Sequence, residues 1–461
     1  MIPRFVYLLA ATCGVASCLA AQDTRTVIEP FFPQLCTTVD AQLQSHGHTL
    51  APADEQKLDT ARIQKAIDKC GKGRAVMLRV NESNNAFLTG PLELRPQITL
   101  IVGVGVTLFA SRDPSLYANE PGSCGIVSHG KSRGCKPLIA ADHATGAGIM
   151  GDGVIDARGG DNMLGSPYSW WDLAEQARSG GGQQVPQLMV INNSDNFTLY
   201  RITLRNSPNF HVTYNHGNGF TVWGLKIDTA HRVANAARPL ARNTDGVDPG
   251  GGSKNITITH SYIRTGDDNI AIKGSTGGVT NMTVSHNHFY WGHGMSIGSE
   301  TYGGISKIRV FDLSLDGTDS GIRIKSNGSR GGLTEDVVYD DVCIRNSPNP
   351  ISLDTAYDAA GTLEGSQPPS MRDITLHNVR VSGGGKITFN GYAKDHRIAV
   401  TLDGVQNTDE AKYNYALNHA DLTLGPGPTN FKFPTGEDST ITGKPAEGNP
   451  ASCADKFVPF P

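Results

Sequence analysis

The sequence predicts an all-β fold, a right-handed parallel β-helix in which each internal repeat forms one coil of a solenoid. Three observations predict it. Glycine is very frequent, with 54 residues in a chain of 461, and a composition so rich in turn residues indicates many short strands. Short apolar runs recur at a nearly constant spacing, and only one segment shows a convincing helical pattern.

The N-terminal residues 1–21 have the pattern of a secretory signal peptide. Arg4 precedes a short apolar run, and Ala20 suits cleavage. The run is too short to span a membrane. We therefore expect a secreted, extracellular protein that has no membrane association in its mature form. Lipoprotein anchoring through Cys18 is the alternative.

The one helical pattern covers residues 54–70, where Ile63 and Ile67 fall on the same face. A solenoid cannot bury its open end alone, so we expect this helix to be part of an N-terminal cap over about residues 30–75.

The repeat itself is clearest in the middle of the chain. Phe220 follows Phe197 by 23 residues, and Ile256, Met282 and Ile308 follow one another at 26. Each repeat contains two or three short β runs and no helix, which excludes ankyrin, tetratricopeptide and leucine-rich architectures. Residues one period apart are then expected to lie above one another, about 4.8 Å apart.

The C-terminal residues, from about 426 to 461, are rich in Pro, Gly and Lys and are expected to form an irregular tail over the last coils. No linker divides residues 30–425, so we predict a single domain over residues 22–461. Cys453 lies alone in the tail, and its state is left open.

Cysteines and charge limit the function further. An even number of cysteines in an exported chain indicates disulfides, for which Cys36 with Cys70 and Cys124 with Cys135 are the candidates. Cys343 lies in a strand-like run, where a buried free thiol is one interpretation. The formal net charge is −4, so overall charge does not drive binding to polyanions, and we expect no nucleic-acid partner and a monomer.

Acidic and basic residues recur at the coil spacing. In chain order they are Asp245, Asp267 with Asp268, His293, and Arg323 with Lys325. Three carboxylates close together disfavour full ionisation, so one is expected to keep a proton near neutral pH. Glycoside hydrolysis needs one such acid and one base, and the basic pair suits a substrate carboxylate. The pattern predicts a hydrolase for an acidic polysaccharide.

Four segments carry a family resemblance. They are Asn243-Thr244-Asp245-Gly246, Gly266-Asp267-Asp268, Gly292-His293-Gly294 and Arg323-Ile324-Lys325. In this order they resemble the signature segments of glycoside hydrolase family 28, the polygalacturonases, and the bacterial endo-polygalacturonases among them. The resemblance covers roughly residues 25–425 and includes Trp170-Trp171, which we interpret as anchoring a loop or short helix.

The resemblance implies a reaction and roles for these residues. It implies hydrolysis of the α-1,4-galacturonosyl linkages of polygalacturonan (pectin) with inversion, endo action, and no cofactor or metal. Asp267 is then the general acid, Asp245 and Asp268 position and deprotonate water, and His293 tunes the acid.

The resemblance also implies the substrate contacts. Arg323 and Lys325 would bind a galacturonate carboxylate, with Tyr357 beside the cleaved bond. The further expected contacts are Asn243, Lys273 and His211.

Other functions remain open from the sequence. An exo-polygalacturonase or a rhamnogalacturonan hydrolase would have the same fold, and a non-catalytic β-helix wall-binding protein would not need an acid, a base and a carboxylate-binding pair together. Asp267 and Asp268 also suit calcium, as used by pectate lyases. A lyase needs an arginine base, however, and has no role for the Gly-His-Gly segment.

Overall fold

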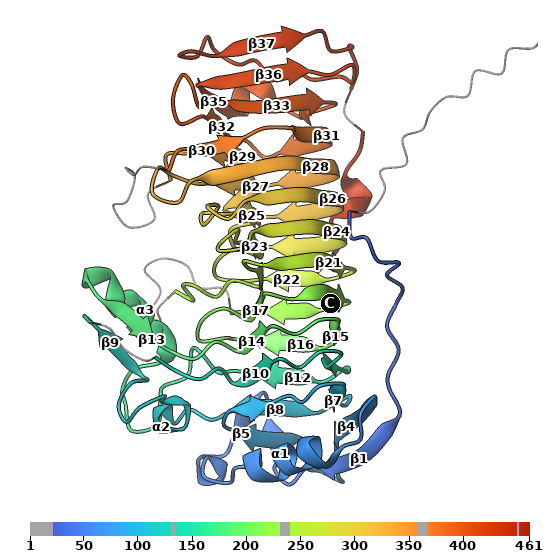
Figure 1. Cartoon of the computed structure of the whole chain (residues 1–461), viewed down its shortest axis with the longest axis vertical. Helices are drawn as coiled ribbons and strands as arrows, with labels where there is room; N and C mark the ends of the chain where they lie inside the picture. Colours follow the sequence, from blue (N-terminus) through green and yellow to red (C-terminus); the bar gives the residue numbers. More distant parts are fainter. Residues whose placement is uncertain (1–21, 131–133, 231–239, 358–366, 450) are drawn as a thin grey trace, which may run out of the picture.

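The computed structural model describes residues 22–130, 134–230, 240–357, 367–449 and 451–461. The chain forms a right-handed parallel β-helix whose coils stack along the long axis of the molecule (Figure 1). This confirms the predicted fold class. Parallel connections take this hand because a twisted strand returns to its own sheet only that way. The predicted signal peptide and Cys18 lie outside the described residues.

Two long sheets form the walls of the solenoid. The strands of the 22-stranded sheet are β1 (Leu35–Asp40), β4 (Arg74–Arg79), β5 (Ala86–Thr89), β7 (Ile98–Val102), β8 (Thr107–Ala110), β11 (Gly148–Met150), β12 (Val154–Asp156), β15 (Phe197–Tyr200), β16 (Thr203–Arg205), β18 (Asn218–Trp223), β19 (Lys226–Asp228), β21 (Ser253–Thr259), β22 (Tyr262–Arg264), β24 (Val279–Tyr290), β26 (Ile305–Asp316), β28 (Gly332–Arg345), β30 (Pro369–Met371), β31 (Ile374–Ser382), β33 (Ile398–Asp403), β34 (Gln406–Asn407), β36 (Ala420–Leu424) and β37 (Thr440–Gly443).

The second sheet carries the candidate site. Its 11 strands are β6 (Leu92–Glu93), β10 (Ile139–Asp142), β14 (Met189–Asn192), β17 (Val212–Asn215), β20 (Val247–Pro249), β23 (Ile270–Ile272), β25 (Met295–Ile297), β27 (Ser320–Lys325), β29 (Asn349–Asp354), β32 (Gly385–Asn390) and β35 (Tyr413–Asn418). Two small pairs complete the strands, β2 (Ser45–His46) with β3 (Thr49–Leu50) and β9 (Ile126–Ser128) with β13 (Gly182–Gln184).

The repeat seen in the sequence is the coil. Phe197 pairs with Phe220, Ile256 with Met282, and Met282 with Ile308, as the spacing predicted. All five side chains are fully buried and stack along the axis of the solenoid. Burying one large apolar side chain contributes roughly 1.5–3 kcal/mol, so each coil adds a similar increment to the same continuous core.

The helices lie outside this core or at its end. Helix α1 (Thr60–Lys69) is shorter than the predicted 54–70, because Pro52–Asp54 forms a 3-10 turn before it. It lies at the end of the solenoid beside β1, with Ile63 and Ile67 buried (Figure 1). Helix α2 (Pro114–Tyr117) and helix α3 (Trp170–Gln176) lie in loops. Both tryptophans that begin α3 are buried and anchor it. No helix of the described residues is long and apolar enough to cross a membrane.

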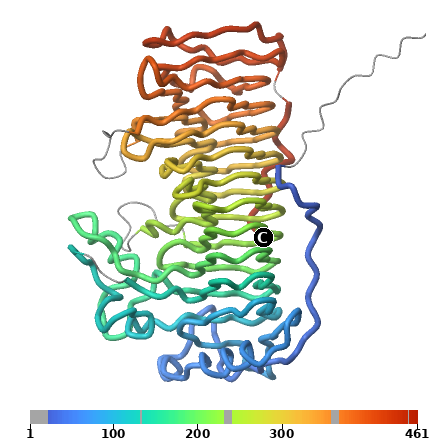
Figure 2. The backbone as a smooth tube through the Cα atoms, in the orientation of Figure 1, coloured from blue at the N-terminus to red at the C-terminus, as the bar shows by residue number. Residues whose placement is uncertain are grey.

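The first described residues, 22–34, and the C-terminal tail run along the outside of the solenoid (Figure 2). Near the start, the Asp23 amide donates to Thr283 Oγ1 of β24 at 3.1 Å. The tail, expected to be irregular, first adds strand β37 beside β36. It then returns to the middle of the molecule, where Val458 O accepts a hydrogen bond from the Tyr290 hydroxyl of β24 at 2.9 Å.

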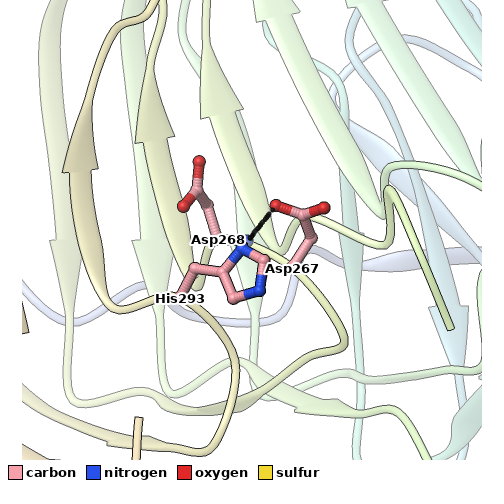
Figure 3. Close-up of side chains that lie close together, drawn as sticks. All are labelled: Asp267, Asp268 and His293. Atoms are coloured by element: carbon pink, nitrogen blue, oxygen red, sulfur yellow. Dashed lines mark hydrogen bonds and ion pairs between the residues drawn. The ribbon is translucent and has the colours of Figure 1, made fainter. Parts of the chain in front are cut away.

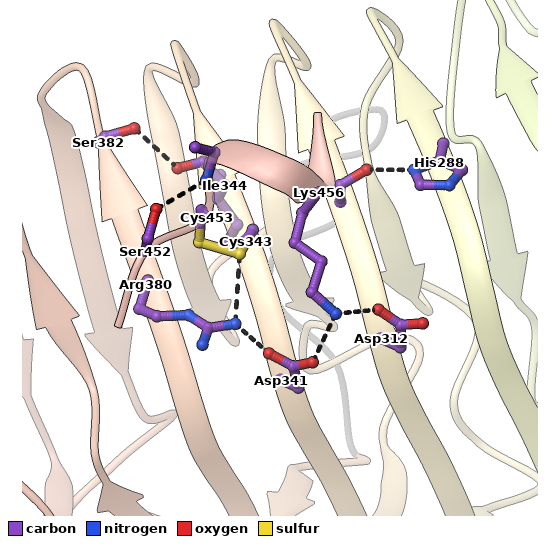
Figure 4. Close-up of a disulfide and its surroundings, with 12 residues drawn as sticks. His288, Asp312, Asp341, Cys343, Ile344, Arg380, Ser382, Ser452, Cys453 and Lys456 are labelled. Carbon is purple, nitrogen blue, oxygen red and sulfur yellow. Dashed lines mark hydrogen bonds and ion pairs between the residues drawn. A yellow bond between two sulfur atoms is a disulfide. The ribbon is translucent and has the colours of Figure 1, made fainter. Parts of the chain in front are cut away.

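Three disulfides join the six cysteines of the described residues. Cys36–Cys70 and Cys124–Cys135 are both formed, as predicted. The free thiol suggested for Cys343 is wrong, because Cys343 is bonded to Cys453 of the returning tail (Figure 4). The two lie 110 residues apart, so their spacing carried no signal.

The tail is held beside this bond by charge as well. Lys456 contacts Asp312 and Asp341 at 2.5 and 2.8 Å (Figure 4). Farther on, Phe460 packs on the guanidinium of Arg264, 3.9 Å from its ring centre.

Candidate active site

Strand register brings the candidate residues to one edge of the 11-stranded sheet. Val247, Ile270, Met295 and Ile322 occupy equivalent positions in β20, β23, β25 and β27, which are consecutive neighbours. Residues a few positions before these strands therefore lie on successive coils. The carboxylates and His293 precede their strands in this way, while the basic pair lies within β27. The predicted stacking is confirmed.

The first group is a chain of three side chains in which His293 is central. His293 Nδ1 lies 3.1 Å from Asp267 Oδ1, and Nε2 lies 3.1 Å from Asp319 Oδ2. Figure 3 shows the imidazole directed at Asp267, with Asp268 beside it. The other Asp267 oxygen accepts from the Asn243 amide at 3.2 Å, so the backbone of Asn243 contacts this carboxylate.

Burial and hydrogen bonding oppose one another in this group. Burial alone would favour the neutral form of His293. Its hydrogen bonds with Asp267 and Asp319 outweigh this effect and raise the pKa of His293 to about 10. Burial likewise favours the neutral form of Asp267, yet its bond with His293 holds the pKa of this carboxyl well below the usual range. In the free protein the proton of the pair therefore lies on the imidazole.

The second group surrounds Asp268, which is 1 % exposed. Its carboxylate accepts from Lys325 Nζ at 2.7 Å, from Arg323 at 3.3 Å and from Ser296 Oγ at 2.6 Å. Burial raises its pKa, but Lys325 and Arg323 outweigh that effect and hold the pKa below its ordinary value. Asp268 is therefore a fixed anion, and the two cations predicted for a substrate carboxylate lie against it.

The third group is a buried lysine between two carboxylates. Lys273 Nζ lies 3.2 Å from Asp245 Oδ2 and 3.5 Å from Asp248 Oδ2. Neither Asp248 oxygen makes a hydrogen bond to any described residue, and its side chain is 2 % exposed. Burial and the neighbouring Asp267 raise the pKa of Asp245 to about 7, and burial beside Asp245 raises the pKa of Asp248 well above its ordinary value.

The carboxyl groups of these three clusters are not all ionised at the same time. Asp245 and Asp248 favour the neutral acid, whereas Asp267 and Asp268 favour the anion. The sequence predicted that one carboxyl keeps a proton near neutral pH, and the pKa of about 7 at Asp245 agrees with it. Such groups titrate as a set.

The charges already present in the site oppose the binding of a metal ion. Asp267, Asp268 and His293 offer ligand atoms within 4.8 Å of one another, the only such group of three among the described residues. However, Lys325 and Arg323 already neutralise Asp268, and His293 carries a proton that it shares with Asp267. A divalent cation would have to displace these charges.

Of the remaining predicted residues, Tyr357 lies beside the cationic pair and His211 is buried below the site. The Tyr357 ring lies 5.3 Å from the Arg323 guanidinium and 5.2 Å from Lys325 Nζ, beside the site. His211, expected to contact substrate, is fully buried beneath it. Its Nδ1 lies 3.0 Å from the carbonyl oxygen of Asp245, and burial lowers its pKa to about 4, so it supports the backbone of Asp245 as a neutral ring.

Two carboxylates at the site were missed from the sequence. Asp319 follows His293 by 26 residues, one coil, and this spacing could have revealed it. Asp248 precedes Lys273 by 25 residues, which is again close to one coil. Both were overlooked because aspartate is common at turns, where its side chain serves the local backbone.

Comparisons with known proteins agree with this geometry. The model for glycosyl hydrolases family 28 matches residues 70–421. An endo-polygalacturonase of Pectobacterium carotovorum subsp. carotovorum is 41 % identical over 89 % of this chain and 96 % of its own length. A polygalacturonase of Ralstonia nicotianae is 36 % identical over 98 % of this chain and 96 % of its own. The solved polygalacturonase from Erwinia carotovora ssp. carotovora superposes with a TM-score of 0.77 at 40 % identity, covering 87 % of this chain and 99 % of that one.

Proposed function

The chain belongs to glycosyl hydrolases family 28, and on this premise we propose that it is an endo-acting polygalacturonase that hydrolyses the α-1,4-galacturonosyl linkages of pectin. One observation carries the proposal. An acid–base set of aspartates lies on adjacent coils beside the cationic pair of Arg323 and Lys325. Such a site can protonate a glycosidic oxygen, activate water and hold a sugar carboxylate at the same time.

We propose that Asp267 is the general acid. In the free protein its proton partner is His293, 3.1 Å away. A bound sugar chain displaces water from Asp267, whose side chain is 23 % exposed, and desolvation favours the neutral carboxylic acid. The proton then moves from the imidazole to Asp267 and on to the glycosidic oxygen as the bond to the anomeric carbon breaks.

The attacking water needs a base on the opposite face of the sugar. We assign this role to Asp245 and Asp268, of which Asp245 accepts the proton and Asp268 orients the water as a fixed anion. The water oxygen bonds to the anomeric carbon opposite the leaving oxygen, so the configuration inverts. The positive charge of Lys273 lowers the pKa of Asp245 and so increases the fraction of this carboxyl that is ionised.

The substrate carboxylate is assigned to the pair of Arg323 and Lys325. A guanidinium has five donor hydrogens, so Arg323 can contact Asp268 and still bind a carboxylate. The Tyr357 ring beside both cations forms a wall of this subsite.

Secretion belongs to the same proposal. Three disulfides suit an oxidising compartment, and residues 1–21 have a signal-peptide pattern. An extracellular enzyme meets its polymeric substrate directly.

The test follows reducing ends, viscosity and product length on polygalacturonic acid. Endo action predicts a rapid loss of viscosity with short oligomers, whereas monomer alone would indicate exo action. Unsaturated products that absorb in the ultraviolet would indicate a lyase. The absence of new reducing ends would refute the hydrolase.

The variant Asp267→Asn tests the assignment of the acid. An amide cannot donate this proton, and loss of general acid catalysis costs roughly 10²–10⁴-fold in kcat. The fold should be unchanged by circular dichroism and melting temperature. Activity close to that of the parent would show that another group is the acid.

A further inference from the structure

A pocket continues the candidate site along the axis of the solenoid. Strand register places Lys325 beside Asp354, Asp354 beside Asn390, and Asn390 beside Asn418. The last two residues line a pocket of about 580 Å³. At about 4.8 Å per coil, this pocket begins about 10 Å beyond Lys325. The pocket therefore lies on the same sheet edge as the cationic pair.

The lining of this pocket differs in charge from the cationic pair. It offers the amides of Asn390 and Asn418 and the phenol of Tyr392, and none of the described residues that line it is a lysine or arginine. Glu437 adds an exposed carboxylate to the wall.

The basic groups nearest the pocket in sequence, His419 and Lys394, both lie beside the carboxylate of Asp438. His419 Nδ1, in the lining, lies 3.8 Å from an Asp438 oxygen, and Lys394 Nζ lies 3.7 Å from the other oxygen of the same carboxylate. At the other end, the Asp354 carboxylate lies beside the pocket and accepts a hydrogen bond from the Asn390 side-chain amide at 2.8 Å. A sugar carboxylate placed here would meet the acidic side chains of Glu437 and Asp354 and no lysine or arginine among the described residues of the lining.

We propose that this pocket binds an uncharged sugar unit, a galacturonate whose carboxyl is methyl-esterified, two to three coils beyond the cationic pair. Esterification removes the charge that Glu437 and Asp354 repel. It leaves oxygen acceptors for the two amides and adds a methyl group that can pack on the Tyr392 ring. The inference rests on the proposed function, because both sites hold one polymer.

The test compares polygalacturonic acid with randomly, partly methyl-esterified pectin. Glu437→Lys places a cation in the pocket wall, and its exposed position protects the fold. The control Glu447→Lys makes the same charge change at an exposed position outside the pocket lining. We expect Glu437→Lys to raise kcat/KM on the unesterified polymer roughly two- to fivefold relative to the esterified one, while the control leaves this ratio unchanged.

Mass spectrometry of the products gives a second reading. On one side of the cleaved bond, the parent should enrich methyl esters at the second and third units beyond the one held by Arg323 and Lys325. Tyr392→Ala should lower kcat/KM on esterified pectin more than on the unesterified polymer. An unchanged ratio in Glu437→Lys, or esters at these units at the bulk frequency, would overturn the pocket proposal while cleavage of polygalacturonate upholds the proposed function. No cleavage of either polymer would overturn both.

Discussion

Replacement of Lys273 by methionine should shift the acid limb of the pH–activity profile to higher pH. Lys273 Nζ lies 3.2 Å from Asp245 Oδ2, and its side chain is 22 % exposed. Asp245 must be ionised to accept a proton from water. Methionine fills a similar volume without the charge, so the change isolates the electrostatic contribution.

The structure sets the size of this shift. At 3.2 Å and an effective dielectric constant of about 20, the direct attraction is about 5 kcal/mol, most of which is offset by desolvation. Opposite charges at such distances lower carboxyl pKa values by about 1–3 units, and partial exposure of the lysine favours the lower part of this range. The pKa of Asp245, about 7 with Lys273 present, should therefore rise by roughly 1–2 units.

The assay measures kcat/KM on polygalacturonic acid across the acidic and neutral range. At pH values below the Asp245 pKa of both proteins, kcat/KM of the variant should be roughly 10- to 100-fold lower than that of the parent. Each unit by which the pKa rises reduces the ionised fraction of Asp245 tenfold. At higher pH it should recover. Lys273→Arg keeps the charge and should retain the parent limb, and Lys254→Met removes an exposed lysine from β21, a strand of the other sheet. A methionine variant whose acid limb overlays that of the parent would refute Lys273 as the group that ionises Asp245.

Two further predictions concern stability. Burial raises the pKa of Asp248 above its value of 3.8 in the unfolded chain. The contribution of Asp248 to the free energy of unfolding is therefore fully present below pH 3.8 and is lost as pH rises through the pKa of the folded protein. Asp248→Asn removes this titration and should reduce the fall in melting temperature between mildly acidic and alkaline buffer; an equal fall in both proteins would mean that Asp248 is ionised when folded. The double variant Cys343→Ser, Cys453→Ser opens a link between residues 110 apart, for which chain entropy gives at most about 5 kcal/mol. It should lower the denaturant midpoint and expose the tail to proteases, and unchanged protection would show that Lys456 and Phe460 hold the tail without the disulfide.

Much of the fold was predictable from the sequence because a solenoid repeats one local rule. The spacing of Phe197, Phe220, Ile256, Met282 and Ile308 identified the coil, and each of these residues stacks as expected. The same spacing brought the aspartates, His293 and the basic pair to one edge. Periodicity sufficed because neighbours along the axis are one period apart in sequence.

Contacts that do not follow the period were not predictable. Cys343 meets Cys453 only because the tail reverses direction, and no spacing encodes that reversal. The burial of His211 under Asp245 depends on which way one side chain leaves a turn. The charge balance around Asp248 likewise depends on distances of a few ångströms between groups that the sequence shows only as polar residues.

The contacts of both terminal segments with β24 change how the solenoid is expected to unfold. In a stack bound only by nearest neighbours, the outermost coils fray first and unravelling proceeds inward. Here Asp23 ties the β1 end to Thr283, and the segment through Val458 ties the β37 end to Tyr290. Fraying at either end therefore pulls on the same central strand, which immediately precedes the turn that carries His293. These contacts couple the two ends of the solenoid and make its unfolding more cooperative.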